Sequence, residues 1–455
     1  MTIEGWASLP ILLAAGREEA LRPLLLQLVV IILAARGGGV VARWLRQPSV
    51  VGEIVAGLLL GPSAFGAWFP DVFAAVFRGG VAAPGGALEA SLTSFSQVGL
   101  ILLLFLIGVE FDFSHVRHQG RLAAGISLAG IAAPFVLVYC LAVAMTPRLV
   151  ALCGESTIDP RSFALFLGTA MSITAIPILG RILIEMGMQH TPLGATVVAS
   201  AACDDAVGWT LLAAVSALAT GGFEAGRIAG MVAATLGFAA ACLFVVRPLL
   251  LPVLERSVRD DAAGDLGPRL PLGMLSVVLA LLFVAAWITS RIGIFAIFGG
   301  FLLGASLSCV PKVRRALAAH LTDFVTVFFL PIFFTFTGLR TNIGSLGTPE
   351  AAGWCAAVFA VAVLGKWGGC GLAARIGGMP AGEASAVGVF MNTRALMELI
   401  VINVGMDLGV IPPAVYCMLV LMAIGTTLMA TPLAARLLRG SPYEPTLVAR
   451  GFLRG

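Results

Sequence analysis

Long uninterrupted apolar segments dominate this chain and restrict it to a membrane fold. Hydrophobic residues make up 59% of its 455 residues and charged residues only 11%, whereas soluble domains carry about 25% charged residues. The segments are long enough to cross a bilayer as helices. A helix satisfies its own backbone hydrogen bonds in lipid, and the short alternating segments of membrane strands are missing. The sequence therefore predicts an all-α polytopic membrane protein.

Thirteen segments are predicted to span the membrane. Lys and Arg number seventeen on one side of these segments and eight on the other. The positive-inside rule then places the N-terminus outside and the C-terminus in the cytoplasm. The predicted spans are 22–45, 48–66, 90–111, 119–146, 161–185, 191–219, 225–252, 270–289, 292–309, 318–340, 350–376, 381–406 and 411–438.

Three short stretches recur in the same order along the chain, which predicts two repeats. They pair the second span with the ninth, the third with the tenth and the fifth with the twelfth. Because this offset of seven spans is odd, the repeats have opposite orientations, as in many secondary transporters. The matches are "EIVAGLLLGPS" (53–63) with "AIFGGFLLGAS" (296–306), "LLLFLIGVEFD" (102–112) with "LPIFFTFTGLR" (330–340), and "MSITAIPILGRILIEMGM" (171–188) with "MNTRALMELIVINVGM" (391–406).

The repeats divide the chain into five predicted parts. These are an external N-terminal tail (1–21), a first inverted repeat (22–219), a linker span with a charged cytoplasmic loop (220–269), a second inverted repeat (270–438) and a cytoplasmic tail (439–455).

Two adjacent aspartates, Asp204 and Asp205 in "ASAACDDAVGW", lie near the middle of span 191–219. Each ionised carboxylate at this depth costs about 2.5–3.5 kcal/mol on insertion scales. Neighbouring residues on a helix diverge by about 100°, so the two acids can have different partners. A purely structural ion pair would explain one of them and leaves the other unexplained. The pair is therefore predicted to bind protons or a metal cation such as Na+ or K+.

Lys366 is the predicted charge partner of these acids. It is one of only two lysines in an arginine-rich chain, and it lies inside span 350–376 at a depth similar to that of Asp204. Unlike arginine, a lysine can lose its proton when it is desolvated. The alternative is a lysine that extends to the membrane surface, which its depth makes less favourable.

Two spans are predicted to be broken, because each carries helix-disrupting or polar residues at membrane depth. Irregular backbone survives there only when it is buried in protein or lines a wet cavity, and free helix ends can coordinate small ions. The alternative is an ordinary proline kink in one span and an ion pair at i,i+4 spacing in the other. The residues concerned are Ser172, Thr174 and Pro177 in the first span and Asn392, Thr393, Arg394 and Glu398 in the second.

The remaining polar residues carry weaker signals. Glu53 lies near a span end and is assigned an interfacial or structural role. The eight cysteines are scattered without a C-x-x-C pair. No zinc spacing, P-loop or nucleophile motif is present, so no cofactor and no enzymatic activity are expected. Because the net charge of +4 is spread over the loops, nucleic acid is not an expected partner.

Taken together, these motifs resemble the monovalent cation:proton antiporter superfamily. The similarity is to the branch with bacterial sodium/proton and potassium/proton antiporters and plant cation/proton exchangers, and it runs from about residue 22 to residue 438. The stretches that carry it are "QPSVVGEIVAGLLLGPSAFG" (47–66), "VGLILLLFLIGVEFD" (98–112), "TAIPILGRIL" (174–183), "ASAACDDAVGW" (199–209) and "NTRALMELIVINVG" (392–405).

The resemblance implies a homodimer in which a core domain moves against a dimerisation domain, with two crossing broken helices in the core. It implies that Asp205 binds the cation or the protons and that Asp204 pairs with Lys366. An Asp at the first position of the acid pair, where electroneutral relatives usually have Asn, points to electrogenic exchange. Many potassium/proton relatives carry a nucleotide-binding regulatory domain, and none is expected here.

The expected function is therefore exchange of Na+, K+ or both for protons by alternating access, in a plasma membrane such as the bacterial inner membrane. One alternative is an ion-coupled carrier of a small organic solute on the same fold. A channel or a membrane sensor is a less favoured alternative, because a channel needs no proton-exchanging acids and a sensor needs an output domain.

Overall fold

The computed structural model describes residues 4–45, 47–77, 87–110, 120–153, 159–174, 176–189, 191–221, 225–260, 268–394 and 396–453. Almost every element within these ranges is a helix, and the only strands there are the two-residue pair β1 (Arg259–Asp260) and β2 (Pro268–Arg269). This confirms the predicted all-α class. Among the described residues, nine helical segments are long and apolar enough to cross a membrane. Four predicted spans are not among these nine: 48–66 and 292–309 contain the shorter apolar helices α2 and α14, 161–185 corresponds to α8 and α9, and 191–219 corresponds to α10.

The first half of the chain contains α1 (Glu4–Trp44), α2 (Ser49–Leu59), α3 (Phe65–Trp68), α4 (Pro70–Phe77), α5 (Ala87–Glu110), α7 (Gly120–Cys153), α8 (Pro160–Ala170), α9 (Ile176–Glu185) and α10 (Pro192–Gly221). The connector contains α11 (Ala225–Ala241), the π-helix η1 (Cys242–Val246) and α12 (Arg247–Ser257). The second half contains α13 (Leu272–Ile292), α14 (Ala296–Leu307), α15 (Pro311–Phe324), the π-helix η2 (Val325–Phe329), α16 (Leu330–Leu339), the 3₁₀ turn η3 (Ile343–Leu346), α17 (Pro349–Ile376), α18 (Ala381–Met391), α19 (Leu396–Asp407), α20 (Pro413–Leu437) and α21 (Glu444–Ala449).

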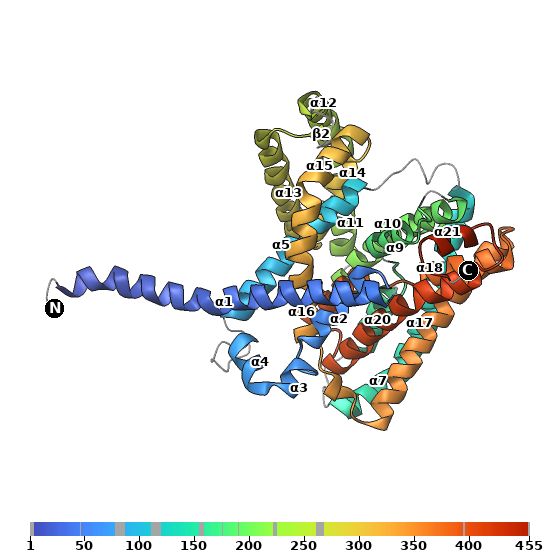
Figure 1. Cartoon of the computed structure of the whole chain (residues 1–455), viewed down its shortest axis with the longest axis horizontal. Coiled ribbons are helices and arrows are strands. Elements are labelled where there is room, and N and C mark those ends of the chain that lie inside the picture. The colour runs from blue at the N-terminus through green and yellow to red at the C-terminus, as the bar shows by residue number, and fades with distance from the viewer. Residues whose placement is uncertain are drawn as a thin grey trace.

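Several boundaries differ from the sequence prediction, and the first two helices are examples. The second span, predicted as 48–66, ends as α2 at Leu59, because Gly61 and Pro62 follow at once and cannot continue a helix well. The first helix begins at Glu4 and runs without interruption into the first predicted span. Residues 4–21 are therefore helical, and Figure 1 shows this part of α1 projecting away from the other helices.

The helices contact one another in two groups. We call α1, α2, α5, α13, α14, α15 and α16 the panel, and α7, α8, α9, α10, α17, α18, α19 and α20 the core. The α11–η1–α12 connector follows the last helix of the first half and contacts both α10 and panel helices. Figure 1 shows the core helices α7, α17, α18 and α20 together on the side opposite the start of α1.

The contacts repeat in the order that the sequence matches predict. In the panel, α2 packs on α16 and its counterpart α14 packs on α5. In the core, α7 packs on α8 and α10, while α17 packs on α18 and α20. Helices α7 and α17, which are counterparts, pack against each other. This pattern is the one that a two-fold relation between the repeats produces, although the exact domain boundaries stay a prediction.

Glycines bring the panel backbones into direct contact. A Cβ added at Gly304 of α14 would lie 2.1 Å from the Phe105 carbonyl oxygen of α5, and a Cβ added at Gly338 of α16 would lie 2.0 Å from the Gly57 oxygen of α2. Only glycine fits at such a crossing, as at the small-residue interfaces of other membrane helices. The glycines of the two matched stretches "EIVAGLLLGPS" and "AIFGGFLLGAS" therefore serve the same packing role in both repeats.

Candidate functional site

Helix α10 carries both aspartates into the centre of the core. The side chains of Asp204 and Asp205 are completely buried. Small residues of the same helix let it approach its neighbours closely. A Cβ at Gly208, one turn after Asp204, would lie only 2.6 Å from the Ile173 side chain. The two acids therefore meet the rest of the core in a region from which bulk water is excluded.

Asp204 has a buried cationic partner. The Lys366 ammonium of α17 donates to Asp204 Oδ2 and to the Ser172 carbonyl oxygen, the latter at 2.5 Å. The Thr174 hydroxyl lies 2.7 Å from the same Oδ2. The structure thus brings together Asp204, Lys366 and two residues from the first broken span, and Lys366 does not extend to the membrane surface, because its side chain is completely buried.

The two broken spans meet at their breaks. Helix α8 ends at Ala170 and α9 begins at Ile176, while α18 ends at Met391 and α19 begins at Leu396. Thr174 Oγ1 lies 3.0 Å from the Met391 carbonyl oxygen, so its single proton can serve either this oxygen or Asp204. Pro177 is the second residue of α9, where its fixed φ suits the start of a helix; its side chain lies outside the described residues, as does Ala175 altogether.

Two cations cover the carbonyls that follow α8. Arg394 Nη1 donates to the Met171 carbonyl oxygen, and Lys366 donates to that of Ser172. Arg394 also donates to the Ala362 carbonyl at 3.1 Å and to Asn392 Oδ1 at 3.2 Å. A helix C-terminus carries partial negative charge, so cations stabilise it there. The Arg394 guanidinium consequently ties the two breaks to α17.

The remaining polar residues of the second break are buried with it. Asn392 accepts from Arg394, and the Thr393 hydroxyl donates to the Phe390 carbonyl at 2.8 Å. Glu398, in the first turn of α19, lies 4.0 Å from Arg394. The predicted i,i+4 pair is thus present as an ion pair, although Arg394 stands in the break and not in the helix.

The buried charges of this site do not cancel. It contains three carboxyl groups, on Asp204, Asp205 and Glu398, and two basic groups, on Lys366 and Arg394. Lys366 pairs with Asp204, and Arg394 pairs with Glu398. Neither carboxyl oxygen of Asp205 has a hydrogen-bond partner among the described residues. A buried carboxylate without a partner is strongly unfavourable, so Asp205 requires a proton or a bound cation.

Two structural contributions to this site could not be predicted from the sequence. Gly130 of α7 lets α17 pack closely beside the site, because a Cβ there would lie 2.4 Å from the sulfur of Cys370, one turn after Lys366. The backbone carbonyl of Ser172, rather than its hydroxyl, contacts Lys366, since the hydroxyl lies 2.6 Å from the Gly168 carbonyl. Glu53 lies apart on panel helix α2, where Arg36 pairs with it at 3.5 Å.

Comparisons with known proteins agree with this architecture. The family model described as sodium/hydrogen exchanger, transmembrane, matches residues 28–440. The Na(+)/H(+) antiporter NhaS4 of Synechocystis is 37% identical over 416 residues, which cover 91% of this chain and 97% of that protein. Cation/H(+) antiporter 17 of Arabidopsis thaliana is 36% identical over 419 residues, and the matched part spans 91% of this chain but only 48% of the plant protein.

A solved structure shows the same fold. The sodium proton antiporter MjNhaP1 from Methanocaldococcus jannaschii superposes with a TM-score of 0.62 over 95% of this chain and all of that one, at 14% sequence identity.

Proposed function

This chain belongs to the sodium/hydrogen exchanger family of multi-pass membrane proteins, and on that premise we propose that it exchanges a monovalent cation for protons by alternating access. Na+, K+ or both are the proposed cations. We further propose that Asp205 is the carboxylate for which cation and proton compete, with Asp204 next to it and Lys366 as the charge partner of Asp204.

The observation that carries this proposal is the unpaired, completely buried carboxyl group of Asp205. The site has one more acidic group than basic groups, so one positive charge neutralises it. A proton or a monovalent cation supplies that charge, whereas a divalent cation leaves an excess. The site is neutral when either a proton or a monovalent cation is bound, whereas an empty site carries a buried negative charge that is costly to move through the membrane. Because the two ions compete for the same carboxylate, the movement of one is coupled to the opposite movement of the other.

The broken helices have a supporting role in this proposal. Ser172 and Thr174 place carbonyl and hydroxyl oxygens close to Asp204 and Lys366. Asn392 and Thr393 follow Met391, whose carbonyl oxygen Thr174 contacts across the crossing. Free carbonyls at such breaks are suited to coordinate small cations. Arg394 and Glu398 are proposed to hold the crossing together and not to carry the transported ion, because Arg394 makes its hydrogen bonds to backbone and to Asn392.

Four further assignments belong to this proposal. The protein is placed in a plasma membrane, with the N-terminus outside and the C-terminus in the cytoplasm, following the Lys/Arg distribution. It is proposed to form a homodimer. It is proposed to act as a transporter only, without enzymatic activity. Its partners are then the transported ions and the lipid bilayer.

The function is tested by exchange in proteoliposomes that contain the full chain. A pH gradient is imposed, and Li+, Na+, K+ or Rb+ is added in turn while the internal pH is followed. We expect Na+, K+ or both to dissipate the gradient, and choline to leave it unchanged. A gradient that none of the four cations dissipates would contradict the proposed exchange.

A second prediction concerns the movement of charge. Competition at Asp205 alone exchanges one proton for one cation and moves no net charge. If Lys366 also releases its proton when a cation binds, two protons cross for one monovalent cation, and one net charge moves per cycle. The membrane potential then acts with about 2.3 kcal/mol per 100 mV on that charge. We expect the rate of Na+/H+ exchange to change when a K+/valinomycin potential is imposed, compared with a clamp at zero.

The double variant Lys366→Met/Asp204→Asn provides the control for this measurement, because it leaves Asp205 as the titrating acid of the pair. Any exchange that remains in this variant should no longer respond to the potential. If the exchange rate of the unmodified protein does not respond to the potential either, electrogenic exchange is ruled out. The remaining mechanism is then exchange of one cation for one proton at Asp205.

A further inference from the structure

A polar network outside the ion site joins the panel to the core. Arg340, directly after panel helix α16, donates to Asp407 Oδ1 at 2.5 Å and to Asn403 Oδ1 at 3.1 Å. Asp407 and Asn403 belong to core helix α19. Asn403 Nδ2 donates in turn to the Thr337 hydroxyl of α16 at 3.0 Å. The Tyr416 hydroxyl of core helix α20 lies 3.0 Å from Asn403 Oδ1.

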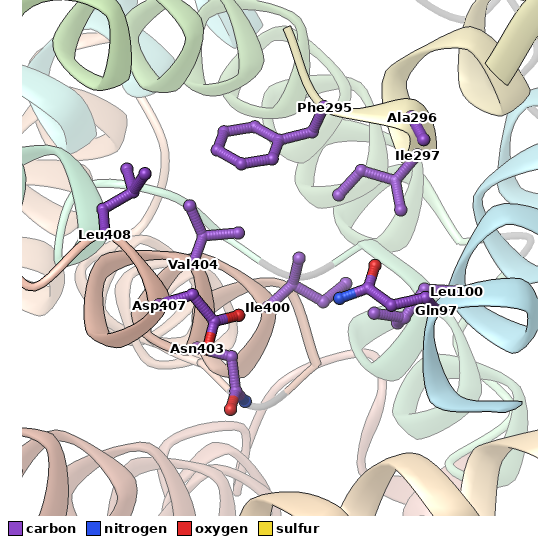
Figure 2. Close-up of a pocket in the computed structure, with 10 residues that line it drawn as sticks. All are labelled: Gln97, Leu100, Phe295, Ala296, Ile297, Ile400, Asn403, Val404, Asp407 and Leu408. Carbon is purple, nitrogen blue, oxygen red and sulfur yellow. The ribbon is translucent and has the colours of Figure 1, made fainter. Parts of the chain in front are cut away.

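This network forms one wall of a cavity between the two groups of helices. Figure 2 shows Asn403, Asp407 and Val404 of α19 on one side, and Gln97 of α5 together with the first residues of α14 facing them. The cavity has a volume of about 100 Å³ and is partly open to solvent. Its polar wall residues Asn403 and Asp407 are the same ones that Arg340 holds.

The position of the network has a mechanical consequence. Asp204 and Asp205 are completely buried, so no ion reaches them from water in this conformation. Both acids and both helix breaks belong to the core, and the boundary with the panel is where helices can slide without disturbing the ion site. Packed helices change their relative position by small shear movements along such boundaries. Charge-assisted hydrogen bonds across the boundary resist this movement.

Arg340 supplies the charged contacts of this link. Its guanidinium also lies over the Phe336 ring, 5.1 Å from the ring centre, which fixes it on the panel side. The Arg340 side chain is 19% exposed and that of Asp407 47% exposed, so water can reach the pair. A partly exposed pair is weaker than a buried one and can be released and remade. The pair is thus suited to open and close repeatedly.

We propose that Arg340 is a latch between panel and core, whose bonds to Asp407 and Asn403 hold α19 in the present conformation and must break in every transport cycle. The proposal rests on the proposed exchange function. The latch is distinct from the proposed ion site, because Arg340, Asp407 and Asn403 are not among the residues assigned to that site. Release of the latch allows α19, and with it the break that contains Arg394, to move relative to α16.

The test is a reversible bridge across the boundary. The Arg340→Cys/Asp407→Cys variant is reconstituted and treated with a short bifunctional methanethiosulfonate reagent, and bridging is measured by mass spectrometry. If the boundary must open, the bridged protein loses at least 10-fold in exchange rate, and dithiothreitol restores it. A long flexible reagent on the same two positions should leave most of the exchange, because it permits the movement. Each single-cysteine variant, treated identically, controls for the native thiols.

The outcomes separate the latch from the function itself. An unmodified chain without exchange would contradict the proposed function, whereas a fully bridged protein that exchanges at the unbridged rate would overturn the latch alone. If the unbridged double variant does not exchange, the pair Asn342→Cys/Leu408→Cys is used instead. It leaves Arg340 and Asp407 in place and joins the segments directly next to them, with the same two expected outcomes.

Discussion

Exchange is expected to fall below detection, by at least 100-fold, when Asp205 is replaced by Asn. The substitution keeps the shape of the side chain and removes its ability to bind a proton or to neutralise a cation. The carboxyl group of Asp205 is completely buried and has no hydrogen-bond partner among the described residues. Its removal therefore breaks no hydrogen bond seen in the structure, and the buried charges of the site then cancel without a bound ion.

This prediction separates folding from transport. Asp205→Asn should be as stable as the unmodified protein or more stable, because an uncompensated buried acid disappears. The measurement is cation-dependent decay of a pH gradient in proteoliposomes, together with the midpoint of thermal unfolding in detergent. Asp71→Asn, at an exposed acid of α4, is the matched control and should exchange normally. Undiminished exchange by Asp205→Asn would remove Asp205 from the mechanism.

The second large effect is expected from Lys366→Met, which should reduce the free energy of unfolding by about 3–5 kcal/mol. Methionine fills a similar volume, so the loss comes mainly from the charge. Without Lys366, the carboxylate of Asp204 remains in the interior, and among the described residues the Thr174 hydroxyl is the hydrogen-bond donor left to it. The Ser172 carbonyl also loses its cationic donor. Thermal or denaturant unfolding of the purified protein in detergent measures the effect.

A double-mutant cycle tests whether this loss comes from the pair. Adding Asp204→Asn to Lys366→Met should restore most of the lost stability, because no unpaired charge is left behind. Two contacting residues should show a coupling free energy of about 0.5–3 kcal/mol. Losses that simply add would show that Lys366 and Asp204 act independently. Arg375→Met is a matched control, since Arg375 is exposed at the end of the same helix and should cost little.

The sequence by itself was sufficient for features that depend on local composition. Apolar segments of bilayer length predict the membrane helices, because side chains in contact with lipid are apolar and a helix satisfies its own backbone hydrogen bonds. The breaks are visible for the same reason, since polar residues and a proline interrupt otherwise apolar runs at Ser172–Pro177 and at Asn392–Arg394. The two aspartates stand out because a carboxylate is costly at membrane depth. The similar depth of Lys366 in its own span also predicts that this lysine pairs with one of the two acids, without saying which one.

Only the tertiary structure decided which charges remain unpaired. Asp204 and Asp205 are neighbours in sequence and equal in depth, and the rotation of α10 against α17 places Asp204, and not Asp205, beside Lys366. The hydrogen bonds from Arg394 to the Met171 carbonyl and from Lys366 to the Ser172 carbonyl join residues more than 190 positions apart in the sequence. The Arg340 latch depends likewise on how α16 meets α19. Hydropathy reports the depth of a residue but not the direction in which it points, and helix rotation and crossing arise only when all the helices pack together.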